Sequence, residues 1–213
     1  MSNSSISSSD NDGTSAASPG RIFFTGNPWP EGHPVKEFRW TAAVRDGRVW
    51  FDLHLRSDDY EAKREIEDPE EEEEEEEEED ARGEDGEYRG DWQSAGVWTN
   101  YHRCTLSSTN WGQGDGFAVC ARADYSLDKL DGLELSVDDP PPDDIEDNVF
   151  HIYLLGHDAA AAHRIRFDRI PGSDRFNITW TGQIALAYTG DLAYKYEFAA
   201  HLYDVAAPRL PAP

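Results

Sequence analysis

Apolar and polar residues alternate along residues 38–56, on both sides of the dipeptide Asp46-Gly47. Asp-Gly is a typical two-residue hairpin turn, because both of its positions tolerate a positive φ. When Arg45 is set opposite Arg48, one face of the ladder is wholly apolar, and a slip of one residue would destroy that pattern. The pairs on this face are Val44/Val49, Ala42/Phe51, Trp40/Leu53 and Phe38/Leu55. We therefore predict an antiparallel hairpin over residues 38–56.

The C-terminal part of the chain alternates in the same way around two further turns. A four-residue turn at 171–174 sets Ile165 opposite Trp180 on the apolar face. A three-residue loop that includes Gly190 then continues the ladder, because glycine supplies the left-handed position that such loops need. Its apolar pairs are Tyr188/Leu192, Leu186/Tyr194, Ile184/Tyr196, Trp180/Ala200 and Ile178/Leu202. These pairs predict a three-stranded antiparallel meander.

Four other segments favour strands, at 94–104, 117–121, 133–137 and 150–154. Three successive prolines at 140–142 cannot continue a ladder, so they end the third of these. Which face of the 94–104 strand is buried stays open. With no pattern for a long helix, we expect about nine antiparallel strands in an all-β fold, a β-sandwich or barrel with a jelly-roll-like form among the alternatives.

Composition divides the chain into a β-domain and polar segments. Residues 1–20 are rich in serine, and residues 58–91 hold 21 Asp and Glu against four Lys and Arg. Both segments lack the apolar residues that a core needs, so we expect them to be disordered. The prediction is one β-domain over 21–205, interrupted by 58–91 and followed by a Pro-rich tail at 206–213.

The net charge of −25 excludes general nucleic-acid binding through a basic surface. Most of this charge lies in 58–91 and in 138–147, which has six acids and no base. The run from Glu70 to Glu79, followed by Asp80, is interpreted as a solvated loop. An alternative is an acidic arm that docks on a basic protein through residues such as Glu70, Glu75, Glu79 and Asp80.

The sequence carries no apolar stretch after its first methionine and no run long enough to span a membrane. We therefore expect a cytoplasmic protein without a membrane partner. Its two cysteines, Cys104 and Cys120, are then expected to be reduced.

One polar face of the predicted meander is a candidate ligand surface. Arg166, Thr179 and His201 lie side by side across its three strands, and Arg164 is in the adjacent row. A small anion or a carboxylate could bridge the two arginines. The plainer interpretation is a solvent-facing sheet with hydrogen bonds and ion pairs.

Histidines supply the candidate metal or acid–base residues. His54 and His151 lie on polar-face positions, His102 is a further candidate, and Asp52 is on the same side of its strand as His54. A zinc site needs three or four such ligands brought together, and strand periodicity does not show that these converge. Enzyme motifs such as GxSxG, HExxH and the P-loop are absent, and we expect no cofactor.

The sequence therefore favours a non-catalytic binding or interaction module. An enzyme that uses the polar-face histidines, with or without a metal, is the first alternative. An acidic decoy for a basic partner, acting through residues 70–80, is the second.

Overall fold

The computed structural model describes residues 19–60, 92–109 and 116–210. In chain order the strands are β1 (Gly20–Phe24), β2 (His33–Arg45), β3 (Arg48–Ser57), β4 (Thr105–Ser107), β5 (Phe117–Ala121), β6 (Leu133–Val137), β7 (His151–Tyr153), β8 (His157–Arg169), β9 (Arg175–Ala185) and β10 (Tyr196–Ala206). The helices are short: α2 (Ala95–Thr99), α3 (Leu127–Leu130) and the 3₁₀ turns η2 (Arg122–Asp124), η3 (Ile145–Asp147) and η4 (Ala187–Thr189).

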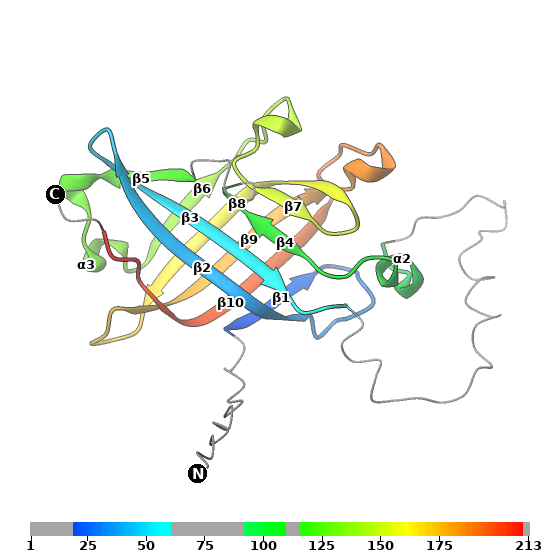
Figure 1. The fold of residues 1–213 in the computed structure, drawn as a ribbon, viewed down its shortest axis with the longest axis horizontal. Helices are drawn as coiled ribbons and strands as arrows, with labels where there is room; N and C mark the ends of the chain where they lie inside the picture. Colours follow the sequence, from blue (N-terminus) through cyan, green and yellow to red (C-terminus); the bar gives the residue numbers. More distant parts are fainter. Residues whose placement is uncertain (1–18, 61–91, 110–115, 211–213) are drawn as a thin grey trace, which may run out of the picture.

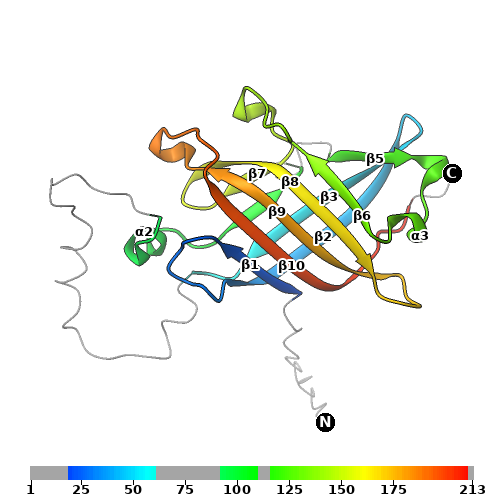
Figure 2. The same ribbon diagram turned by 180° about the vertical axis from the view of Figure 1, so that it is seen from behind.

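Eight of the strands close into an antiparallel barrel (Figures 1 and 2). Around the barrel the order is β1, β2, β3, β4, β7, β8, β9 and β10, and β10 pairs with β1 to complete the circle. Two further strands extend the wall, since β5 pairs with the beginning of β3 and β6 pairs with the end of β8. The all-β prediction is confirmed, and the barrel is the form that the fold takes.

The predicted hairpin is confirmed residue for residue as β2 and β3. Arg45 pairs with Arg48, and the ladder continues through Trp40 opposite Leu53 and Phe38 opposite Leu55. The side chains of Val49, Phe51, Leu53 and Leu55 in β3 point into the barrel and are fully buried. Val44, near the turn, is 37 % exposed because the hairpin tip extends past the core.

The meander is confirmed as β8, β9 and β10, with Ile165 opposite Trp180 and Ile184 opposite Tyr196. The connection between β9 and β10 differs from the prediction, because β9 ends at Ala185 and η4 takes the place of the predicted pairs Leu186/Tyr194 and Tyr188/Leu192. Local hydrogen bonds explain this, since the Thr189 amide and hydroxyl both donate to the Leu186 carbonyl.

The predicted strand at 94–104 is wrong. Its alternation never separated apolar from polar residues, because Trp98 shared a face with Asn100 and His102. One helical turn, α2, instead buries Val97 and Trp98 together, and Trp98 Nε1 donates to the Trp92 carbonyl at 2.8 Å. Strand β4 begins only at 105.

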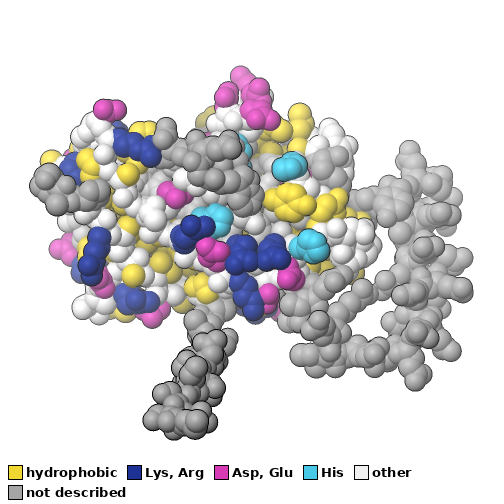
Figure 3. Space-filling model, viewed as in Figure 1, with side chains coloured by type: hydrophobic (Ala, Val, Ile, Leu, Met, Phe, Trp, Pro, Cys, Tyr) yellow, Lys and Arg dark blue, Asp and Glu magenta, His cyan; other side chains and the backbone are white. Residues whose placement is uncertain are grey.

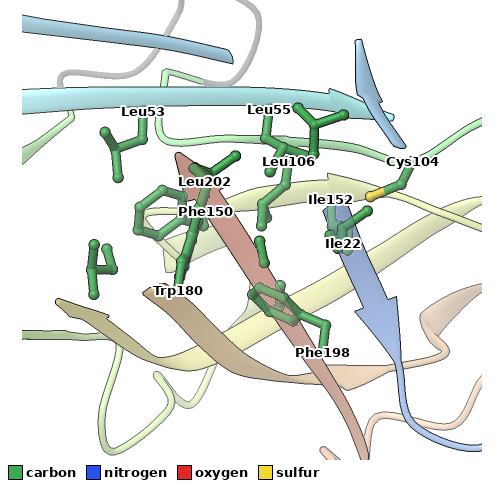
Figure 4. Close-up of a cluster of buried hydrophobic side chains, with 14 of the residues drawn as sticks. Ile22, Leu53, Leu55, Cys104, Leu106, Phe150, Ile152, Trp180, Phe198 and Leu202 are labelled. Carbon is green, nitrogen blue, oxygen red and sulfur yellow. The ribbon is translucent and has the colours of Figure 1, made fainter. Parts of the chain in front are cut away.

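The barrel interior is filled with large side chains that reach inward from opposite walls (Figure 4). Trp180, Phe150 and Phe198 meet near the middle, with ring centroids 4.8 Å apart for Trp180 and Phe150. At one end a second aromatic group surrounds Trp98 and closes the barrel. Its members are Phe24, Trp29, His33, Tyr60 and Trp92.

Gly182 lies where β9 faces the most crowded part of this core. A Cβ atom at this position would come within 2.6 Å of the Phe198 ring and 2.8 Å of His163 Nδ1. Both neighbours are buried, so neither can swing into solvent. Glycine is therefore required here by close packing.

We predict that Gly182→Ala lowers the free energy of unfolding by about 1–3 kcal/mol, the usual cost of overpacking a core. Thr181→Ala, at the next and outward-facing position, should change it by less than about 0.5 kcal/mol. Urea denaturation of both variants measures the difference. Equal midpoints would contradict the close packing at Gly182.

His163 is the one histidine that the described barrel encloses completely. Trp180 Nε1 donates to its Nδ1 at 3.1 Å, so the ring holds its own proton on Nε2. Burial among Phe150, Trp180 and Phe198 lowers the pKa of His163 to about 3, because the charged ring would lose its hydration. The imidazole is therefore neutral at physiological pH.

This burial makes stability fall in acid. Between pH 6.5 and pH 3 the unfolded chain binds a proton at His163, whereas the folded chain does not. The free energy of unfolding therefore decreases as the pH decreases. We predict that the wild type loses about 2 kcal/mol more than His163→Gln between pH 7 and pH 5, as measured by urea denaturation. Parallel curves for the two proteins would contradict a neutral buried imidazole.

Candidate functional site

An open groove of about 560 Å³ lies on the outer face of β8, β9 and β10. The segment that follows β6 forms one wall through Pro140 and Pro141, and Ala199 of β10 lies on the other side. The polar side chains that line it are those of Thr25, Asp139, Arg164, Thr181, Gln183 and Glu197. The groove is therefore bordered by both donors and acceptors.

A β-bulge places Arg164 in this groove. Between Ala161 and Arg164, β8 has one residue more than β9, and Ala162 adopts a φ of 51°. Before the bulge the odd-numbered residues face outward, and after it the even-numbered residues do. The same irregularity thus turns Arg164 outward and His163 into the core.

Asp138 fixes the segment that forms the proline wall. Its Oδ2 accepts from the amides of Val149 at 2.9 Å and Phe150 at 3.4 Å, and its carbonyl accepts from the Ala162 amide. Partial burial raises the pKa of Asp138, and the two amide donors oppose that rise. Asp138 thereby joins the wall to the bulge through its carbonyl and to the residues just before β7 through its carboxylate.

The predicted polar row exists, and it lies beside the groove. Arg166 pairs with Thr179, and Thr179 pairs with His201, on the outer face. Of the four predicted residues only Arg164 lines the groove. Both arginines are already engaged, since Arg164 contacts Asp139 and Arg166 contacts Asp168. The hydrogen bond from Arg166 to Asp168 raises the pKa of this exposed guanidinium.

Within the groove the charges of Arg164 and Asp139 offset each other, so the net charge of the lining side chains is the one negative charge of Glu197. Over the described ranges, no ion pair involves Glu197. Arg164 contributes one Nη2 to the pair, so its remaining N–H groups stay available to a ligand. The site is thus weakly acidic, with one arginine donor.

The opposite wall carries mixed charges that lie against one another (Figure 3). Arg39 and Arg56 share Glu37, at 2.8 and 3.2 Å. His54 lies in the same part of the wall, and burial and then Arg39 lower its pKa. This wall is a network of ion pairs rather than a surface of one sign.

The histidines proposed as metal ligands belong to separate places. His54 is in β3, His102 precedes β4, and His151 is in β7. Strand β4 separates His54 from His151, because Ser107 pairs with each of them. Among the residues with a described placement, no three His, Cys, Asp or Glu side chains are arranged to hold a metal ion. The acidic-run residues Glu70, Glu75, Glu79 and Asp80 lie outside the described residues.

Both cysteines are free thiols, as expected from the sequence. Cys104 points into the barrel (Figure 4), and burial strongly raises its pKa. Its thiol is therefore unreactive in the folded chain. Cys120, on β5, is only partly buried and has a more modestly raised pKa for the same reason.

Sequence patterns did not identify Thr25, Gln183 or Glu197 as site residues. Thr25 follows β1, a strand that was not predicted because its short apolar run, Ile22 to Phe24, shows no alternation of apolar and polar residues. Gln183 and Glu197 pair on the outer face of the meander, but nothing in a strand pattern shows which outer pairs a distant loop will cover. The run Asp138–Pro142 was the available signal for such a loop.

Comparison with known proteins found no family model, no curated protein and no solved structure that matches this chain. No helix in the described part of the chain is long and apolar enough to cross a membrane.

The two neighbouring carboxylates of the proline wall should differ in their effect on stability. Asp139→Ala removes a surface ion pair and should cost less than about 1 kcal/mol. Asp138→Ala removes the acceptor of two backbone amides and puts alanine at a φ of 52°, so we expect about 2–3 kcal/mol. Urea denaturation at pH 7 gives both values. Equal costs would show that Asp138 does not anchor the segment.

Proposed function

We propose that this protein is a non-catalytic binding module that holds an extended polypeptide segment in the groove on β8, β9 and β10. The observation that supports this most directly is the groove itself, whose volume of about 560 Å³ is within the usual range of ligand sites. Its walls are provided by strands and by an anchored segment, so its shape exists before a ligand binds.

The filled interior favours a site on the outside of the barrel. Eight-stranded barrels that carry small ligands keep a cavity inside, whereas here Trp180, Phe150 and Phe198 pack against one another at the centre. Leu53 and Leu202, from opposite walls, are both fully buried beside them. A ligand therefore meets this protein at its outer surface.

The groove's chemistry suits a polypeptide backbone. The free N–H groups of Arg164 can donate to carbonyl groups, while Gln183 and Glu197 can accept from amides. Pro140 and Pro141 offer rigid apolar surface for an aliphatic or aromatic side chain. Because Glu197 leaves one negative charge, we expect a segment that carries a basic residue.

The alternatives have less support. An acid–base enzyme would need several of the predicted histidines in one pocket, and the hollow that His151 lines includes neither His54 nor His102. The acidic decoy depends on residues that are not described. Neither alternative uses the groove.

The test is selection from a display library of random twelve-residue peptides on the full-length protein, in about 0.3 M salt to screen the acidic segments. We expect selected peptides to carry a basic residue and to bind Thr181→Trp, which fills the groove, at least about tenfold more weakly than wild type. Thr41→Trp, on the opposite wall, is the control and should bind normally.

Thr179→Trp distinguishes the groove from the adjacent polar row. Selected peptides that lose binding to this variant but bind Thr181→Trp normally would move the site to the row of Arg166, Thr179 and His201. A library that yields no peptide sensitive to either substitution would contradict the proposal.

A further inference from the structure

A second, smaller hollow of about 240 Å³ lies on the same side of the barrel, between η3, β7 and the start of β8. It is separate from the groove, with which it shares no lining residue. Its floor consists of paired residues of β7 and β8, since Tyr153 pairs with His157 and His151 pairs with Ala159. Ala159 faces outward yet is only 4 % exposed, so the segment that contains η3 covers it.

Asn148 carries the strongest sign of a ligand in this hollow. The residue is only 4 % exposed and forms part of the wall. Nδ2 donates to the Ala160 carbonyl at 3.0 Å and to the Tyr194 hydroxyl at 2.9 Å, which fixes the amide's orientation. Oδ1 is buried and receives no hydrogen bond from any described residue. A buried acceptor without a donor is costly, and a donor on a ligand would satisfy it.

The charge around the hollow has one sign. Glu146 lines it with an exposed carboxylate, Asp158 lies in its wall with a side chain on the inward-facing register of Ile152, and neither lysine nor arginine is among its described lining residues. The adjoining segment 138–147 has six acids and no base, and Figure 3 shows acidic side chains gathered where this segment projects from the barrel. The potential in the hollow therefore attracts a cation.

The remaining walls suit an organic cation. The rings of Tyr153 and His157 meet edge to face, with centroids 5.6 Å apart, and aromatic faces attract ammonium groups. A bare metal ion would need three or four ligands converging on one point, and the described residues provide no such set. The volume equals roughly eight water molecules, which limits the ligand to the size of an amino acid.

We propose that this hollow binds a small organic ammonium ion, whose N–H groups donate to Asn148 Oδ1 and to the carboxylate of Glu146. Asn148 selects for a donor, Glu146 supplies the opposite charge, and Tyr153 and His157 enclose the carbon skeleton. This site does not depend on the groove, and Thr181→Trp should leave it unchanged.

The test is an NMR titration of the full-length protein with benzylammonium and with benzyl alcohol, which has nearly the same shape but no charge. We expect saturable benzylammonium binding with a Kd of about 1 mM or tighter, and with the largest shifts at the Asn148 side-chain amide and the Tyr153 ring. Benzyl alcohol should bind at least about tenfold more weakly, because it carries no positive charge for the Glu146 carboxylate to attract.

Two exposed carboxylates provide matched variants. Glu146→Gln should weaken benzylammonium binding at least about fivefold, whereas Asp143→Asn, outside the hollow, should leave it unchanged. Equal binding of the alcohol, shifts centred elsewhere, or equal losses in both variants would overturn the proposal. Zn²⁺ alone that displaces benzylammonium and shifts His151 and His157 would also overturn it, because the site would then bind a metal.

Discussion

The whole structure depends on side chains alternating between the interior and the outside around a closed circle of eight strands. A barrel of this size has an interior just wide enough for side chains to fill, and here aromatic rings such as Trp180 and Phe198 fill it. Closure leaves those strands no free edge along most of the circle, so backbone pairing and core packing support each other. Ligand sites are consequently confined to the outer wall.

The bulge in β8 interrupts this alternation of inward and outward side chains. One extra residue reverses the direction of the side chains that follow, so that His163 enters the core while Arg164 enters the groove. Gly182 makes room for that arrangement, since any larger residue would collide with His163 and Phe198. The stability of the core and the shape of the outer groove are therefore determined by the same few residues.

Charge is distributed unevenly over the outer wall. Ion pairs with nearby carboxylates offset the charges of Arg39, Arg56, Arg164 and Arg166, so these parts of β2, β3 and β8 present little net charge. Segment 138–147 differs, because it concentrates acids without a base next to a hollow that contains an unsatisfied acceptor. A cationic ligand would satisfy the unpaired acceptor in the hollow and offset the negative charge around it. The groove differs from the hollow, because an arginine lines it together with carboxylates.

The sequence by itself determined the register of β2 with β3 and of β8, β9 and β10. A period of two leaves no alternative register once a turn such as Asp46-Gly47 is fixed, and it correctly placed Arg166, Thr179 and His201 side by side. Tertiary structure alone decided the rest. Trp98 lies in a helical turn because it packs into the aromatic group that closes one end of the barrel. Asp139, Asn148 and Glu197 line the groove or the hollow because the segment after β6 packs over strands that are distant from it in the sequence. Such contacts join residues far apart in the chain, and local periodicity contains no information about them.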